Sequence, residues 1–270
     1  MPKDITLQQQ KVSAAFSRQS LVFDELDEKN QILAWIRDKV RKHVLSYWKQ
    51  GEHILELNAG TGLDALFFAQ QGFYVHATDN APGMLAVLSH KVNRLSLGNR
   101  VTSQQCSFLE LDKIQGKYDH IFSNFGGLNC TKKLDEVIHS FSSLLKPGGT
   151  ATLVIMPPIC PWEMLLAFKG NFKIAFRRLK KNGTPSHLEG IYFNSYYYKP
   201  SQVKKMFGLG YKLLSIKGLA SLVPPPYLEN FPSHFPRVFK RLTSMEDTLG
   251  GIWPFNKWAD HFIITLQKCS

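Results

Sequence analysis

An apolar run that ends in a carboxylate and a glycine turn is the part of the chain best suited to chemistry. Residues 53–62 read His-Ile-Leu-Glu-Leu-Asn-Ala-Gly-Thr-Gly, and Asp79 closes a second apolar run, residues 74–79. A strand, a tight turn, a helix and a second strand ending in an acid form the βαβ unit that binds nucleotides. The pattern therefore predicts a nucleoside site.

The position of Glu56 indicates which nucleoside is bound. Residues 60–65 also fit the glycine pattern of dinucleotide-binding proteins, but a carboxylate at the tip of the first strand would repel a pyrophosphate on the helix N-terminus. S-adenosylmethionine has no phosphate and carries a sulfonium and an ammonium, which an acid attracts. Asp79 can accept both ribose hydroxyls, each bond being worth about 1.5–3 kcal/mol. The alternative is that Glu56 caps a helix and Asp79 ends a strand with no ligand.

Three segments together resemble the class I S-adenosylmethionine-dependent methyltransferases. They are residues 56–62, Asp-Asn-Ala-Pro-Gly-Met at 79–84 and Leu-Lys-Pro-Gly-Gly at 145–149. The similarity is closest over residues 50–156, and it implies methyl transfer with S-adenosylmethionine as the cofactor. The cofactor-binding residues that it implies are Glu56, Asn58, Ala59, Gly60, Gly62, Asp79, Asn80, Met84, Cys106, Ser107, Phe108 and Asn124.

Two residues depart from the pattern of that family. Asn58 stands where the family usually has Gly, so either the backbone lies further from the methionine part of the cofactor or the Asn side chain bonds to it. Ser107 stands where relatives often carry an Asp that bonds the adenine amino group, and its hydroxyl or the Phe108 backbone would take over that role. The departures keep open a non-catalytic alternative, a regulatory protein that binds the nucleoside without turnover.

Length and composition favour one α/β domain. The 270 residues are 44% hydrophobic, enough for a large core. Cys106, Cys130, Cys160 and Cys269 are scattered, with no C-x-x-C pair and no His at ligand spacing, so we expect reduced thiols and no metal site. The first residues are polar, and no apolar run reaches the roughly 18 residues of a membrane span, so we expect a cytoplasmic protein.

Alternating strands and helices must position these side chains. The alternation along residues 53–156 predicts a doubly wound, mostly parallel sheet, preceded by N-terminal helices that include one at 27–48. Residues 211–217 and 261–267 are expected to complete seven strands, and the resemblance makes them an antiparallel pair with the last strand inserted. The turn at 123–129 should lie between cofactor and acceptor, with Asn124 in contact. The other expected strands are 53–58, 74–79, 101–106, 118–123 and 151–156, and the expected helices are 63–71, 82–95 and 133–145.

Two insertions distinguish the chain from a bare cofactor domain. Both follow strands whose carboxyl ends border the expected cofactor crevice, where open α/β sheets bind ligands, so by elimination they hold the substrate. The chain then divides into an N-terminal helical cap (1–50), a cofactor-binding core (51–156), a substrate lid (157–199), a core continuation (200–220), a second substrate insertion (221–258) and a final core strand (259–270).

The insertions also hold the side chains that could take a proton from the acceptor. A sulfonium methyl needs no activation, so the protein has to align an acceptor oxygen, nitrogen or carbon atom and exclude water. His187 and His234 are the candidate catalytic bases, with structural or surface positions as the alternative. Phe16, Arg18 and Phe23 could close over the cofactor, although a core position is favoured for the two phenylalanines.

The first insertion predicts a basic amphipathic helix at residues 162–181. Residues 151–270 carry 16 Lys and Arg against 6 Asp and Glu, whereas residues 1–150 are nearly balanced. Such a helix suits an anionic membrane, an anionic amphiphilic acceptor or RNA, and the alternative is a lid helix with a solvated basic face. The basic face would hold Lys169, Lys173, Arg177, Lys180 and Lys181, and the apolar face Met164, Leu165, Phe168, Phe172, Ala175, Phe176 and Leu179.

Together these features predict methyl transfer to a small hydrophobic or amphiphilic acceptor, with contact to an anionic membrane as a further expectation. An RNA or protein methyltransferase is an alternative that the same cofactor core would serve. Nucleic acid is the less favoured partner because aromatic residues in the insertions alternate with aliphatic residues and prolines, which favours an enclosed apolar cavity over an open stacking platform. The sequence does not indicate an oligomeric state.

Overall fold

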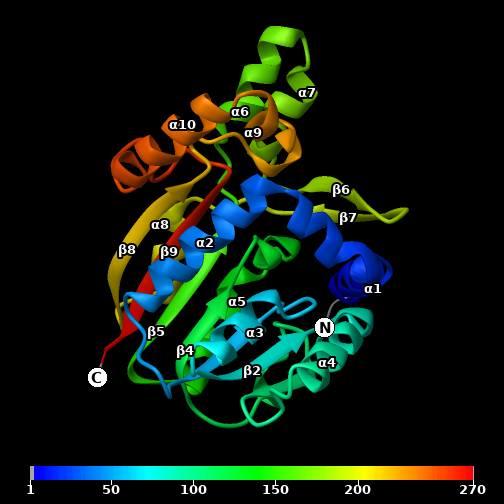
Figure 1. The fold of residues 1–270 in the computed structure, drawn as a ribbon, viewed down its shortest axis with the longest axis vertical. Coiled ribbons are helices and arrows are strands. Elements are labelled where there is room, and N and C mark those ends of the chain that lie inside the picture. The colour runs from blue at the N-terminus through cyan, green and yellow to red at the C-terminus, as the bar shows by residue number, and fades with distance from the viewer. Residues whose placement is uncertain (1–2, 270) are drawn as a thin grey trace.

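A central sheet of seven strands organises the computed structural model, which describes residues 3–269 (Figure 1). The strand order is β3-β2-β1-β4-β5-β9-β8, parallel from β3 to β5, with β9 antiparallel to both neighbours. This confirms the predicted doubly wound α/β fold with its last strand inserted. The strands are β1 (His53–Leu57), β2 (Tyr74–Asp79), β3 (Val101–Gln105), β4 (Tyr118–Ser123), β5 (Leu145–Ile155), β8 (Tyr211–Leu219) and β9 (His261–Lys268).

Helices cover both faces of the sheet because side chains alternate along each strand. In β1, Ile54 packs into the apolar cluster that includes α2 and α3, while Leu55 and Leu57 pack into the cluster that includes α5 and α8. Glu56 therefore points to the same face as Ile54. The helices of the core are α2 (Gln31–Leu45), α3 (Leu63–Gln70), α4 (Pro82–Arg94), α5 (Leu134–Leu144) and α8 (Pro200–Phe207).

The N-terminal cap consists of two helices that meet at Asn30. The predicted single helix at 27–48 is wrong in its start, because Asn30 leaves the helical conformation and its side chain accepts hydrogen bonds from the backbone N–H groups of Ile32 and Leu33. The helix before this cap, α1 (Lys3–Lys29), runs from the α2 junction over α4 (Figure 1). The cap thus reaches across the carboxyl ends of the central strands.

The insertions lie at the carboxyl edge of the sheet, at the top of Figure 1. The first holds α6 (Pro161–Met164), α7 (Phe172–Ala175) and the hairpin of β6 (Thr184–Leu188) and β7 (Ile191–Ser195), which contacts α1. The second holds α9 (Phe231–His234) and α10 (Pro236–Leu249). In residues 3–269 no helix combines the length and the apolar character needed to cross a membrane.

The predicted continuous helix at 162–181 is wrong. Two short α-helices and two 3-10 turns occupy this stretch, and the chain reverses at Gly170, whose φ is 75°. Asn171 then caps α7, with its side chain accepting a hydrogen bond from the N–H of Ile174 at 3.4 Å. Glycine after one helix and asparagine before the next are strong end signals, and they outweigh the amphipathic periodicity.

Candidate cofactor and active site

The turn after β1 takes left-handed backbone at three positions, which explains its residue types. Asn58, Gly60 and Gly62 have φ values of 47°, 57° and 81°. A Cβ at Gly62 would lie 2.1 Å from Cδ1 of Leu88, so only glycine fits there. Asn tolerates this conformation best after glycine, and the Asn58 Nδ2 donates to Ser123 Oγ at 3.1 Å. The departure from the family pattern at Asn58 is therefore compatible with the usual loop conformation.

Asp79 lies against this turn at the end of β2. One carboxylate oxygen accepts the N–H of Gly60 and the other accepts the N–H of Ala81, both at 2.8 Å. Burial raises the pKa of the Asp79 carboxyl, and the two backbone N–H groups act against this shift. Each oxygen keeps a second lone pair, so the half-buried carboxylate is suited to accept ribose hydroxyls.

A cavity opens beside Asp79 at the carboxyl ends of β1, β2 and β4. Its wall also contains Ala81, Phe125, Gly127 and Cys130. Glu56, Ala59, Gly62 and Ser107 are not in this wall. The predicted cofactor residues that line it are Asn58, Gly60, Asp79, Asn80, Met84, Cys106, Phe108 and Asn124.

Helix α1 forms the roof of the cavity with Val12, Ser13, Phe16 and Phe23. The Ser13 hydroxyl donates to the backbone oxygen of Asn80 at 2.8 Å. Phe16 and Phe23 are half-buried in this position, whereas the sequence favoured the core for them. The roof therefore comes from the N-terminal cap.

Two polar side chains of α1 tie this roof to the wall. Gln8 donates from Nε2 to the backbone oxygens of Cys130 at 3.2 Å and Asn194 at 2.8 Å. Gln9 donates to Ser107 Oγ at 2.8 Å, so the hydroxyl expected at the adenine edge is engaged by α1. Arg18 is exposed and donates to the backbone oxygen of Glu189 at 3.1 Å, away from the cavity wall.

Adding a methyl group at Gly83 is expected to loosen the roof. A Cβ there would lie 2.7 Å from the backbone oxygen of Ser17, so α1 must move away from α4. Overpacking of this kind costs about 1–3 kcal/mol, which shifts the docked population of α1 about five- to 150-fold. Gly83→Ala should speed release of S-adenosylhomocysteine in stopped flow and increase hydrogen exchange in α1. Gly98→Ala is the matched control because open space surrounds Gly98; equal effects in both variants would contradict the role of this contact.

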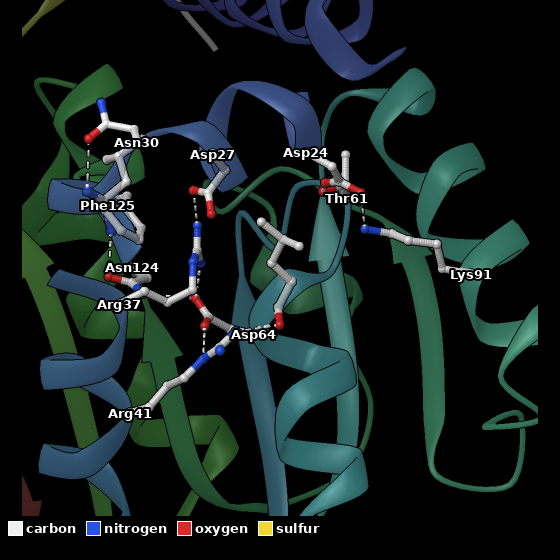
Figure 2. Close-up of polar contacts among 12 residues, drawn as sticks. Asp24, Asp27, Asn30, Arg37, Arg41, Thr61, Asp64, Lys91, Asn124 and Phe125 are labelled. Carbon is white, nitrogen blue, oxygen red and sulfur yellow. Dashed lines mark hydrogen bonds and ion pairs between the residues drawn. The ribbon is translucent and has the colours of Figure 1, made fainter. Parts of the chain in front are cut away.

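Beneath the turn, Asp64 is the centre of a buried charge cluster (Figure 2). Its carboxylate accepts from Arg37 Nη1 at 2.7 Å, from Arg41 Nε at 2.7 Å and from Asn124 Nδ2 at 2.8 Å. These partners outweigh burial and lower the pKa of Asp64. Glu56 is buried nearby with Oε2 unpartnered, and burial together with the charge of Asp64 raises its pKa well above the ordinary value. Because Glu56 is buried beneath the turn and is not in the cavity wall, it does not face the cofactor cavity as the sequence predicted.

The comparisons with known proteins agree with this geometry. Residues 54–149 match the family model described as a methyltransferase domain. Residues 54–149 thus carry a methyltransferase domain, and the fold of the chain is that of the class I S-adenosylmethionine-dependent methyltransferases. Among curated proteins this chain is similar to the demethylmenaquinone methyltransferase of Clavibacter sepedonicus, with 30% identity over 155 residues, 55% of this chain and 59% of that one. The enzyme of the same name from Corynebacterium efficiens is 26% identical over 144 residues, 52% and 59% of the two chains. The matches thus span 59% of the length of both relatives.

Solved structures share the fold over nearly the whole chain. A DhpI complex with S-adenosylhomocysteine superimposes with a TM-score of 0.60 at 12% identity and covers 97% of both chains. Magnesium protoporphyrin IX methyltransferase from Synechocystis, also with S-adenosylhomocysteine bound, gives a TM-score of 0.59 at 15% identity and covers 97% of this chain and 99% of that one. At such identities the likeness shows the fold alone.

The two histidines expected to be catalytic lie outside the cavity wall. His187 is exposed on the β6–β7 hairpin, with its ring 4.5 Å from that of Tyr192. His234 is exposed in α9, with Nδ1 2.9 Å from the backbone oxygen of Asn230. The structure therefore gives neither side chain a contact with the cofactor residues.

A buried histidine at the start of β9 was missed by the sequence reasoning. His261 has Nδ1 2.9 Å from Oδ2 of Asp260, and its ring centroid lies 6.3 Å from that of Phe125 in the cavity wall. Arg178 donates to Asp260 at 2.6 Å and to Glu163 at 2.7 Å, and His261 and Arg178 hold the pKa of the Asp260 carboxyl below its ordinary range. In the sequence, this pair could have been found from the Asp and His that are adjacent at the start of the last strand.

Cys160, Glu163 and Asp260 also place potential metal ligands within 4.8 Å of one another. Both carboxylates are already bound by Arg178, and Glu163 additionally by Arg177. A guanidinium at the centre of such a group occupies the place and the charge that a cation would need. We interpret the group as an ion-pair cluster that joins the first insertion to β9.

Proposed function

We propose that this protein transfers the methyl group of S-adenosylmethionine to a small hydrophobic or amphiphilic acceptor. The observation that carries the proposal is the cavity beside Asp79, which is roofed by α1 and walled mainly by apolar side chains with a few polar groups at one end. The curated relatives are named for a quinone-type acceptor, and one structural neighbour is named for a porphyrin. Both names agree with this acceptor class.

The residues present fit the cofactor. Asp79 supplies two acceptor oxygens at the place of a ribose, and the left-handed turn at Asn58 and Gly60 leaves room for close approach. Met84 and Phe108 line the cavity on the side expected for the base. When bound, S-adenosylmethionine supplies an electrophilic methyl on a sulfonium. The protein orients the acceptor in line with it, while α1 excludes water.

Within the same proposal, His261 takes the proton of an acceptor hydroxyl or amine. Its ring is not itself in the cavity wall, but its centroid lies 6.3 Å from that of the wall residue Phe125, and Asp260 lies against its Nδ1. A carboxylate beside the ring stabilises the imidazolium that forms when the histidine takes a proton, although Nδ1 makes no aligned hydrogen bond with it. Asn124 joins the cavity to the buried charge cluster. It lines the cavity wall, and its side-chain amide donates a hydrogen bond to Asp64.

Replacing His261 is expected to reduce turnover without weakening cofactor binding. General base catalysis contributes typically about 10²- to 10⁴-fold, so His261→Gln should lower kcat within that range and abolish the acid limb of the pH–rate profile. The affinity for S-adenosylmethionine, measured by calorimetry, should be unchanged. His187→Gln is the matched control because that ring is exposed on the hairpin. An unaltered pH profile in His261→Gln, or a loss that His187→Gln shares, would exclude the base.

Radiolabelled S-adenosylmethionine tests the acceptor class. The protein is incubated with a prenylated naphthohydroquinone, a long-chain alkylphenol, bulk RNA and a mixture of unfolded proteins. Label in one of the first two supports the proposal. Label confined to RNA or protein favours the alternative macromolecular acceptor, and tight cofactor binding without transfer to any of them, or to a total lipid extract, favours the regulatory alternative.

A further inference from the structure

We propose that residues 165–181, here named the tip, dock the protein on an anionic lipid membrane. The proposal rests on the proposed function, because it explains how an amphiphilic acceptor reaches the site. The tip follows α6 and includes α7, and it projects beyond the carboxyl edge of the sheet at the top of Figure 1. The cofactor cavity lies at the same edge of the sheet.

Large apolar side chains are exposed together on the tip. Phe168 is 89% exposed and Phe172 is 62% exposed, and Leu165, Phe176 and Leu179 are exposed to about half their area. A globular surface rarely exposes so many contiguous large apolar groups unless they meet a partner or a membrane. The break at Gly170 lies between Phe168, near the end of the 3-10 turn, and Phe172, the first residue of α7, so the two most exposed phenylalanines flank it.

On the tip, the charged side chains that form no ion pair within residues 3–269 are all positive. Lys169, Lys173, Lys180 and Lys181 are exposed, and no ion pair within residues 3–269 involves them. The acid that precedes them in the insertion, Glu163, is buried under Arg177 and Arg178 and so does not offset them. A phenylalanine cluster with a lysine rim complements the hydrocarbon and the headgroups of an anionic bilayer.

The base of the tip is rigid. Glu163 accepts two hydrogen bonds from Arg177, at 2.8 and 2.7 Å, and two from Arg178, at 2.9 and 2.7 Å. Arg178 continues to Asp260 beside β9. The tip is therefore fixed to the central sheet, and docking it on a bilayer would hold the carboxyl edge of the sheet, with the acceptor site, towards the lipid.

A bilayer is favoured over RNA because the aromatic side chains protrude from a turn and are accompanied by leucines. Base stacking needs aromatic rings laid out along a groove that follows the nucleic acid backbone. Insertion into the headgroup boundary needs only protruding apolar groups with cations behind them. RNA binding is therefore an outcome that the experiment must be able to detect.

The test is flotation of the whole 270-residue chain with vesicles of phosphatidylcholine alone or with 30% phosphatidylglycerol (about one anionic lipid in three). Each lysine near an anionic surface contributes about fivefold to partition, so neutralising three reduces it about 100-fold. Lys169→Gln, Lys173→Gln and Lys180→Gln combined should show this loss, and Phe168→Ser with Phe172→Ser should lose at least about tenfold. The matched controls, at the opposite edge, are Lys204→Gln, Lys205→Gln and Lys212→Gln combined, and Leu209→Ser, all at exposed positions.

The inference is overturned if the wild type does not bind anionic vesicles at low salt, if the controls lose as much as the tip variants, or if structured RNA competes the protein off the vesicles. Methyl transfer separates this outcome from failure of the proposed function. Tip variants should keep transfer to a short-chain, water-soluble acceptor and lose transfer to a bilayer-embedded one. Vesicle binding without transfer to either acceptor would leave the membrane surface standing and refute the proposed function.

Discussion

Asp79→Ala is expected to weaken S-adenosylmethionine binding by at least about 1.5–3 kcal/mol, roughly 10- to 150-fold, because charge-assisted bonds to ribose hydroxyls are lost. The substitution also removes the acceptors for the N–H groups of Gly60 and Ala81, so the cofactor turn loses its support. Calorimetry measures the affinity. Asp79→Asn keeps one oxygen acceptor and should lie between the alanine variant and the wild type.

Two controls accompany this measurement. Neither the wild type nor the variants should bind NAD, because the cofactor that the comparisons support is S-adenosylmethionine. The melting temperature of Asp79→Ala shows whether the domain is still folded at the temperature of the titration. An unchanged affinity in a folded Asp79→Ala would remove this residue from the site.

Asp64→Ala is expected to lower the free energy of unfolding by about 3–5 kcal/mol, which is the cost of leaving buried charges unpaired. Arg37 and Arg41 would lose their shared carboxylate, and Arg37 is itself buried with Nε unpartnered. Urea unfolding measures the change. Glu25→Ala is the matched control, because Glu25 forms an exposed ion pair with Lys29 and its loss should have no measurable effect.

Replacing Asp64 should also change how the free energy of unfolding depends on pH in the acid range. The pKa of Asp64 is lower in the folded protein than its ordinary value near 3.9. Its stabilisation is therefore complete above that ordinary value and is lost as the pH falls through the lower, folded pKa. Asp64→Asn should flatten this part of the profile. If the Asp64 variants lose little stability and their free energy of unfolding depends on acid pH as in the wild type, Arg37 and Arg41 have found other partners.

The cofactor half of the site could be predicted because its geometry is local. Asn58, Gly60 and Asp79 belong to one βαβ unit, in which the chain itself fixes the distance between turn and strand end. The seven strands follow from the same short-range alternation. The role of Asn58 was not anticipated: the sequence suggested a shifted backbone or a bond to the cofactor, whereas the residue takes left-handed backbone and its side chain donates to Ser123.

The acceptor half could not be predicted, because its contacts join distant parts of the chain. Arg178 and Asp260 are 82 residues apart in the sequence, and only the fold brings them together. The periodicity at 162–181 favoured a helix, yet one glycine and one asparagine were enough to divide it. His187 and His234 are suitable by residue type alone, and the structure places both on the surface.

Asp24 of α1 connects the roof of the cavity to the cofactor turn, since it accepts hydrogen bonds from Thr61 at 2.5 Å and Lys91 at 2.6 Å (Figure 2). Lifting α1 would expose this lysine without its partner, and Arg37 would lose Asp27 in the same movement. Under the proposed function, release of the spent cofactor past a lifted α1 would break both ion pairs, which adds an electrostatic barrier to that step. We expect the residence time of the spent cofactor to limit the catalytic cycle, so that acceptors of very different reactivity are methylated at similar maximal rates.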